Sequence, residues 1–178
     1  MRNHHRAFTI VELLIVIVVI AVLAATTIVA YNGIQNRAND TTVQADLNNF
    51  GKYLKLKEVD LGSPPAGGAV RSGGTDTGSS QGFTGIAFRF SRGAYLASVN
   101  NVYYCSGVET ATGQISFRIY ARSKSLETFK YSSNGTVMDI GQVAISSNYC
   151  LQEYSNTGSW SYGYEATSGG IWFNWTNG

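Results

Sequence analysis

The stretch FTIVELLIVIVVIAVLAATTIVAY, from Phe8 to Tyr31, decides the fold of this chain. It contains one charged side chain, Glu12, and no charge follows between Leu13 and Tyr31. Crossing the hydrocarbon layer of a bilayer takes about 20 helical residues. The stretch is therefore long enough and apolar enough to form a transmembrane helix, with a carboxylate near its start.

The flanks of this stretch fit two interpretations. Arg2 and Arg6 precede it, and a basic start of this kind keeps the N-terminus in the cytoplasm. A secretory signal peptide has the same layout, and small residues around Ala25 offer a cleavage site. Glu12 disfavours a signal peptide, whose apolar region is usually uncharged. The helical pattern also continues well beyond Ala25, which favours a permanent helix.

The apolar pattern continues as one face of a helix after Tyr31. No proline occurs before Pro64, and Gly33 weakens a helix by about 1 kcal/mol without ending it. We predict one helix over residues 8–57, about 75 Å long, with an apolar half over residues 8–31. The second half is amphipathic, and the stripe of apolar side chains along one side of it needs a sheet to cover it. That stripe has the spacing i, i+4, i+7, i+11: Val43, Leu47, Phe50 and Leu54.

Charge and histidine content exclude several classes of site. The chain has 13 basic and 11 acidic residues, and Arg2 and Arg6 account for the whole excess. A general basic footprint for nucleic acid is therefore absent, although a local patch is not excluded. The only histidines are His4 and His5, so the body lacks Ser-His-Asp catalysis and histidine metal ligands. We expect no enzyme activity, no metal and no cofactor.

After the helix, residues 58–178 form a predicted globular head. Residues 61–82 are rich in Gly, Ser and Thr and indicate a connection. Apolar residues alternate over 86–90 and 115–121, which is typical of half-buried strands. Asn134-Gly135 is a hairpin signal. We expect four to six antiparallel strands packed on the helix stripe, which is an α+β fold.

Two features of the head are open to more than one use. The two cysteines, Cys105 and Cys150, favour a disulfide and hence an exported head. The aromatic-rich residues 159–178 could bind sugars or a partner surface if they are exposed. Ile171, Phe173 and Trp175 share one parity, however, and we favour a last strand that caps the core.

The segment RAFTIVELLIVIVVIAVLAA resembles the class III leader of type IV pilins and pseudopilins. That family has a short basic leader, a cleavage point, Phe-Thr, and Glu as the fifth mature residue before an apolar helix. The resemblance implies that residues 1–7 are a cleaved cytoplasmic leader. Cleavage would fall between Ala7 and Phe8, and Phe8 would be N-methylated. Family members usually have glycine where this chain has Ala7.

The resemblance also implies a role for Glu12 in assembly. A charge inside a bilayer costs a few kcal/mol, so Glu12 calls for a partner. Cleavage creates a free amino group on Phe8, and Glu12 of a neighbouring subunit could pair with it. Such a pair fixes register more than it adds stability. Smooth apolar helices attract one another with little axial preference, and the pair would supply that preference.

The resulting expectation is a structural subunit of a type IV pilus-like filament, which serves adhesion, twitching motility or DNA uptake. Its partners would be related subunits, a prepilin peptidase, an inner-membrane assembly platform and, before assembly, membrane lipid. It would span the membrane once and then join an extracellular or periplasmic filament. Two alternatives stay open: a pseudopilin of a type II secretion system, and a membrane-anchored, lectin-like module that does not polymerise.

Overall fold

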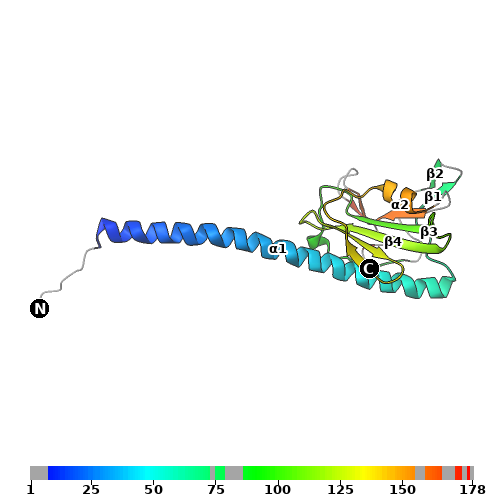
Figure 1. Ribbon diagram of the computed structural model, residues 1–178, viewed down its shortest axis with the longest axis horizontal. Helices are drawn as coiled ribbons and strands as arrows, with labels where there is room; N and C mark the ends of the chain where they lie inside the picture. The colour runs from blue at the N-terminus through cyan, green and yellow to red at the C-terminus, as the bar shows by residue number, and fades with distance from the viewer. Residues whose placement is uncertain are drawn as a thin grey trace, which may run out of the picture. The chain divides into compact units, whose positions relative to one another are not determined.

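The computed structural model describes residues 8–72, 75–78, 86–154, 159–165, 171–173 and 176. Contacts divide the chain into two compact units, Met1–Arg37 and Ala38–Gly178. Helix α1, Ile10–Leu61, contributes residues to both units (Figure 1). The globular unit adds the 3-10 helix η1, Arg92–Ala94, and the short helix α2, Ser147–Glu153.

Helix α1 starts two residues after the predicted start and ends four residues after the predicted end. Gly62 follows its last residue with φ +74, the left-handed conformation in which glycine commonly ends a helix. Pro64 then prevents continuation. Gly33 lies inside α1 and does not interrupt it. The prediction of one long helix is therefore confirmed, and local C-terminal signals set its end.

The main sheet has seven strands in the order β2-β1-β7-β3-β4-β5-β6, and every pair is antiparallel. A second sheet pairs β8 with β9. The α+β fold class is confirmed, with more strands than the expected four to six. The strands are β1 Ala69–Ser72, β2 Thr75–Gly78, β3 Val102–Val108, β4 Ile115–Arg122, β5 Thr128–Ser132, β6 Val137–Asp139, β7 Ser159–Tyr162, β8 Tyr164–Glu165 and β9 Ile171–Trp172.

Two local predictions in the head are wrong. The predicted connection over residues 61–82 contains the hairpin β1–β2, whose strands are separated in sequence by Gly73-Gly74. Gly-Gly is itself a hairpin signal, so composition alone misled the prediction. Residues 86–90 belong to no strand. The apolar alternation of these residues instead reflects packing on α1. The rings of Phe88 and Phe90 lie against Phe50, with ring centroids 5.0 and 5.2 Å apart.

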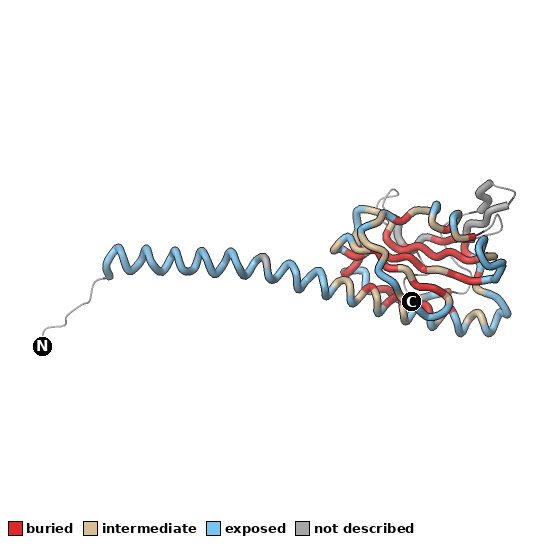
Figure 2. Tube along the Cα trace, viewed as in Figure 1, coloured by how far each residue is buried: buried red, intermediate tan, exposed pale blue. Residues whose placement is uncertain are grey.

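The second half of α1 covers one face of the sheet as predicted. All four residues of its stripe are 0% exposed, and they join a cluster with Phe117 and Ile119 of β4. Figure 2 shows buried residues along the strands and on this part of α1. A second cluster, with Tyr103, Tyr120 and Trp160, covers the opposite face. Both faces of the central strands are therefore buried.

Gly51 provides a test of how closely α1 packs on the sheet. A Cβ at Gly51 would lie 2.1 Å from Cζ of Tyr131, whereas a Cβ at Gly33 meets nothing within 4 Å. Gly51→Ala should lower the free energy of unfolding by about 1–3 kcal/mol, because overpacking outweighs the helix propensity of alanine. Urea titration of the full chain in detergent checks this. Gly33→Ala is the matched control and should not destabilise the chain.

Candidate functional site

The N-terminal end of α1 is organised by reciprocal hydrogen bonds between Thr9 and Glu12. The Thr9 backbone N–H donates to Oε2 of Glu12 at 2.9 Å, and the Thr9 hydroxyl donates to the same oxygen at 2.8 Å. The Glu12 backbone N–H donates to the Thr9 hydroxyl oxygen at 3.2 Å. This is a capping box, which satisfies N–H groups that the first helical turn leaves unpaired.

The sequence interpretation missed this second use of Glu12. The signal was present, because Thr9-Ile10-Val11-Glu12 matches the pattern Thr-x-x-Glu directly before an apolar run. Both bonds from Thr9 end on Oε2, and none of the hydrogen bonds described for this part of the chain uses Oε1. The carboxylate can therefore cap its own helix and still accept a hydrogen bond from another group.

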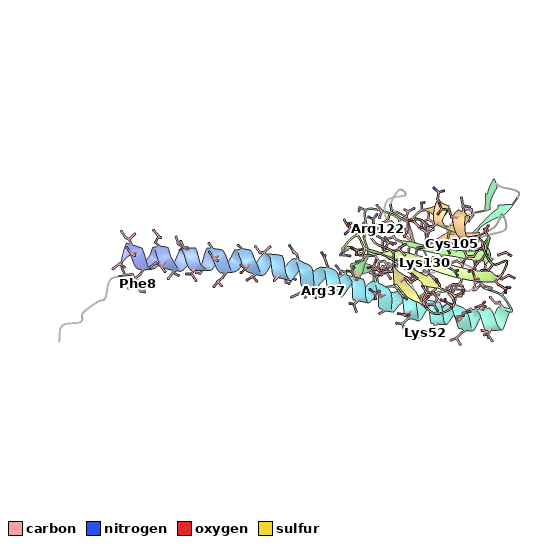
Figure 3. The ribbon with its side chains drawn as sticks, viewed as in Figure 1. Phe8, Arg37, Lys52, Cys105, Arg122 and Lys130 are labelled. Atoms are coloured by element: carbon pink, nitrogen blue, oxygen red, sulfur yellow. A yellow bond between two sulfur atoms is a disulfide. The ribbon has the colours of Figure 1, made fainter. Side chains whose placement is uncertain are left out.

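The side chains after Glu12 form an apolar surface on all sides of α1. Phe8 is 84% exposed, and the large apolar side chains described between Ile10 and Tyr31 are all at least half exposed. Figure 3 labels Phe8 at the start of this surface. Among the residues that the structure describes, one helix, α1, is long and apolar enough to cross a membrane. A surface of this kind is stable only when lipid or other apolar side chains cover it.

The structure places the predicted processing residues only in part. Phe8 and Glu12 lie together at the exposed start of α1, whereas Ala7 and the rest of the predicted leader lie outside the described residues. The predicted cut between Ala7 and Phe8 and the methylation of Phe8 remain predictions.

The predicted disulfide between Cys105 and Cys150 is present, and its Cα atoms are 5.3 Å apart. It joins β3 to α2, and both cysteines are buried in the second cluster. These are the two cysteines of the chain, so neither is a free thiol. The bond therefore fixes α2 to the face of the sheet opposite α1.

An ion-pair network fixes the end of α2 beside the disulfide. Arg118 of β4 pairs with Glu109, and its Nε lies 3.0 Å from Oε2 of Glu153. Lys130 of β5 lies 2.7 Å from Oε1 of Glu153, and the Tyr120 hydroxyl donates to the same oxygen at 2.6 Å. A pocket of about 440 Å³ opens beside these groups. Two cations face two anions there, so the network neutralises itself and serves to hold α2.

Hydrogen bonds hold one carboxylate of this network in its charged form. The hydroxyl groups of Ser116 and Thr112, and then the charge of Arg118, lower the pKa of Glu109. Glu109 therefore stays charged even at a pH equal to the ordinary pKa of a glutamate side chain. Burial, followed by the bond to Glu153, raises the pKa of Tyr120. Its hydroxyl consequently stays protonated and remains a donor.

A buried carboxylate on α1 connects the helix to residues 91–95. Asp46 is 8% exposed and accepts hydrogen bonds from the Ser91 N–H at 2.7 Å, the Ser91 hydroxyl at 3.1 Å and the Tyr95 hydroxyl at 2.9 Å. Burial and then the charge of Asp46 raise the pKa of Tyr95 well above its usual value. The signal in the sequence is a lone acid between the stripe residues Val43 and Leu47.

The described aromatic residues of the C-terminal stretch contribute to the core. Trp160 is 3% exposed in the second cluster, and Phe173 is 8% exposed in the first. Trp172 packs on Phe90 with ring centroids 6.4 Å apart. Of the three residues of shared parity, Phe173 confirms the prediction of a core role, and the burial of Ile171 lies outside what the structure describes. The last strand, β9, pairs with β8 rather than with the main sheet. Trp175 lies outside the described residues.

Comparison with known proteins agrees with this arrangement. The family model described as the prokaryotic N-terminal methylation motif matches residues 2–28. The chain is 46% identical over 63 residues to the type IV wide pilus major component PilA4 of Thermus thermophilus. That match covers 35% of this chain and 47% of the relative, so the chain spans about half the length of the curated relative it matches.

No solved structure matches the chain at a significant level. Three features support a likeness to type IV pilins: the motif over residues 2–28, the match to the pilus relative, and a long apolar helix followed by an antiparallel sheet. The chain therefore carries the prokaryotic N-terminal methylation motif and is similar to a type IV pilus component over about a third of its length.

Proposed function

We propose that the chain is a structural subunit of a type IV pilus-like filament that polymerises through the first half of α1. The observation that carries the proposal is the apolar, exposed surface between Phe8 and Tyr31, headed by the methylation motif. Lipid covers this surface before assembly, and the same surfaces of neighbouring subunits cover it in the filament. The role is structural, and it requires no catalytic group.

The layout of the chain supports the following order of insertion, processing and assembly. The leader, residues 1–7, stays in the cytoplasm, the apolar half of α1 crosses the membrane, and the head lies outside. A prepilin peptidase cuts between Ala7 and Phe8, and the new amino group of Phe8 is methylated. An inner-membrane assembly platform then moves the subunit into an extracellular filament. The disulfide between Cys105 and Cys150 suits a head exposed to an oxidising environment.

The proposal favours a pilus over the two alternatives. The Thermus relative is a major component of a type IV pilus, which supports a pilus rather than a secretion pseudopilus. The lectin-like alternative needs exposed aromatic side chains. Trp160 and Phe173 are buried instead, which weakens that alternative.

The geometry at Glu12 supports two simultaneous uses of its carboxylate. Oε2 accepts both hydrogen bonds from Thr9 of the same chain. Oε1 is then available to the Phe8 amino group of a neighbouring subunit. A charged pair removed from water has little net stabilising value, but it distinguishes one axial position from the others. The capping box also holds Glu12 in place before the neighbour arrives.

The variant Glu12→Gln separates these two uses. Glutamine can complete a capping box but carries no charge, so the helix start should remain intact while the pair is lost. Membrane insertion should be normal. The yield of sheared filaments should fall by about tenfold or more, because loss of one partner leaves the other charge buried and unpaired at a cost of about 3–5 kcal/mol, and 1.4 kcal/mol already corresponds to a factor of ten. Electron microscopy and immunoblotting of the sheared fraction measure the yield.

Glu12→Ala is the companion variant, because it removes both the charge and the cap. It should reduce filament yield at least as strongly as Glu12→Gln. Mass spectrometry of the mature N-terminus shows whether each variant is still cut and methylated at Phe8, which separates failed processing from failed assembly. Normal filament yield from Glu12→Gln, with a defect only in Glu12→Ala, would show that capping is the whole role of Glu12.

A further inference from the structure

The pattern Asn-x-Thr, which accepts N-linked glycans in exported proteins, occurs three times in the chain. The matches are Asn39-Asp40-Thr41, Asn134-Gly135-Thr136 and Asn174-Trp175-Thr176. A pattern this short arises often by chance, so its place in the fold has to separate the matches. A folded acceptor needs an exposed asparagine amide, an exposed threonine hydroxyl beside it, and a backbone that leaves the fold easily.

Two of the three matches do not meet these conditions. Asn39 is half-buried and lies inside α1, where the helical hydrogen bonds hold the backbone. Thr176 is 0% exposed, and its hydroxyl donates to the Phe173 carbonyl at 2.6 Å. A transferase that acts on the folded head therefore cannot reach the hydroxyl of Thr176.

The third match forms the tip of the hairpin between β5 and β6. Asn134, Gly135 and Thr136 are all exposed. The Ser132 N–H donates to the Thr136 carbonyl at 2.9 Å, and the Gly135 N–H donates to the Ser132 carbonyl at 2.8 Å. Gly135 has φ +92, a left-handed conformation that glycine adopts without strain. The middle residue of the pattern thus makes the turn, and its two neighbours point away from the sheet.

Hydrogen bonds within the tip orient the side-chain amide of Asn134. The Thr136 N–H donates to Oδ1 of Asn134 at 3.1 Å, and the Thr136 hydroxyl donates to the same oxygen at 2.7 Å. This arrangement is an Asx turn. None of the hydrogen bonds described for the hairpin uses Nδ2 of Asn134. The turn therefore holds the amide beside the threonine hydroxyl and leaves its nitrogen exposed.

The position of the hairpin in the sheet allows the tip to open. Strand β6 has three residues, stands last in the strand order, and pairs with β5. A short element of this kind opens locally at a small fraction of the free energy of global unfolding. Opening would release the tip without disturbing the central strands or the disulfide between Cys105 and Cys150. The tripeptide can therefore enter the active site of a transferase while the head stays folded.

We propose that Asn134 carries an N-linked glycan, transferred to the folded head from a lipid diphosphate-linked oligosaccharide. Nδ2 of Asn134 attacks the anomeric carbon of the first sugar, so a C–N bond forms while the C–O bond to the diphosphate breaks. The lipid diphosphate leaves with the electron pair of that bond, and Nδ2 gives one proton to a base of the transferase. The inference rests on the proposed function only in that the head is exported.

Peptide mapping by mass spectrometry tests the proposal on the full chain purified from the cells that make it. In most chains, the peptide that contains Asn134 should be heavier by the mass of one or more sugar residues. Electron-transfer fragmentation should place the added mass on Asn134. The peptides that contain Asn39 and Asn174 should be unmodified and serve as internal references.

Three variants examine the two side chains of the tip. Asn134→Asp keeps an acceptor oxygen for Thr136 but lacks the nitrogen, so the hairpin should persist while the added mass is lost completely. Thr136→Val keeps the shape of threonine without its hydroxyl and should also lose the added mass, whereas Thr136→Ser should retain it. Asn39→Asp makes the same change in α1, is the matched control, and should leave the added mass in place.

Several outcomes would overturn the proposal. An unmodified Asn134 in the parent chain is one, and an added mass that survives Asn134→Asp is another, because it places the sugar on a hydroxyl group. A glycan on Asn39 or Asn174 in place of Asn134 would show that the exposed Asx turn does not select the acceptor. The same samples report cleavage at Phe8 and filament yield separately. A chain that assembles without a glycan contradicts this inference alone, and a glycosylated chain that never assembles contradicts the proposed function alone.

Discussion

Removal of the disulfide between Cys105 and Cys150 should lower the free energy of unfolding of the head by about 4 kcal/mol. The bond spans a sequence separation of 45 residues, and such a link restricts the unfolded chain much more than the folded one. It also joins α2 to β3, close to the ion pairs of Glu153. Since folded domains are stable by only about 5–15 kcal/mol, this loss is a large share of the total.

Urea titration of the full chain in detergent micelles, followed by tryptophan fluorescence, measures the change. Trp160 reports directly, because it lies in the same buried cluster as both cysteines. The oxidised parent is compared with the reduced parent and with the variant Cys105→Ala, Cys150→Ala. The reduced parent keeps both side chains, so it controls for the volume that alanine removes. A reduced parent within about 1 kcal/mol of the oxidised one would contradict the expected loss.

Replacement of Asp46 by alanine should destabilise the head by about 3–5 kcal/mol. The variant removes two hydrogen bonds to a charged acceptor, from the Ser91 N–H and the Tyr95 hydroxyl, and bonds of this kind contribute about 1.5–3 kcal/mol each. Tyr95 is 1% exposed, so water cannot easily replace the carboxylate. The better helix propensity of alanine returns only about 0.5 kcal/mol.

A double-mutant cycle with Tyr95→Phe isolates the contribution of the buried hydroxyl. Phenylalanine removes the group that Asp46→Ala leaves unpaired, so the double variant should lose less than the sum of the single losses, by about 1 kcal/mol or more. Asp46→Asn keeps one acceptor oxygen and should lose less than Asp46→Ala. Additive effects in the cycle would show that Asp46 does not stabilise Tyr95.

The start of the chain shows how much a local pattern can predict. The run from Leu13 to Tyr31 and the stripe through Val43 and Phe50 predicted one helix, its two halves and its buried face. Both patterns are local, because helical neighbours are three or four residues apart. The end of the helix was missed by four residues, although Gly62 and Pro64 carried the signal.

Strands were predicted less well, for a physical reason. Residues 86–90 alternate like a strand, yet Phe88 and Phe90 find their partners on α1 rather than on a neighbouring strand. Residues 69–78 lack apolar alternation and still form β1 and β2. A strand needs a hydrogen-bonding partner that lies elsewhere in the chain, and the pattern of one segment does not identify that partner.

By itself, the sequence determined the apolar helix, its leader-like start, the place of Glu12 and the α+β class, because each depends on spacing within one segment. The tertiary structure decided which distant groups meet. It joined Asp46 to Tyr95, placed the ion pairs of Glu153 beside the disulfide, and gave Leu126 a left-handed backbone in the turn between β4 and β5. These contacts join residues far apart in the chain, or arise where the folded sheet imposes a backbone conformation that the residue itself disfavours.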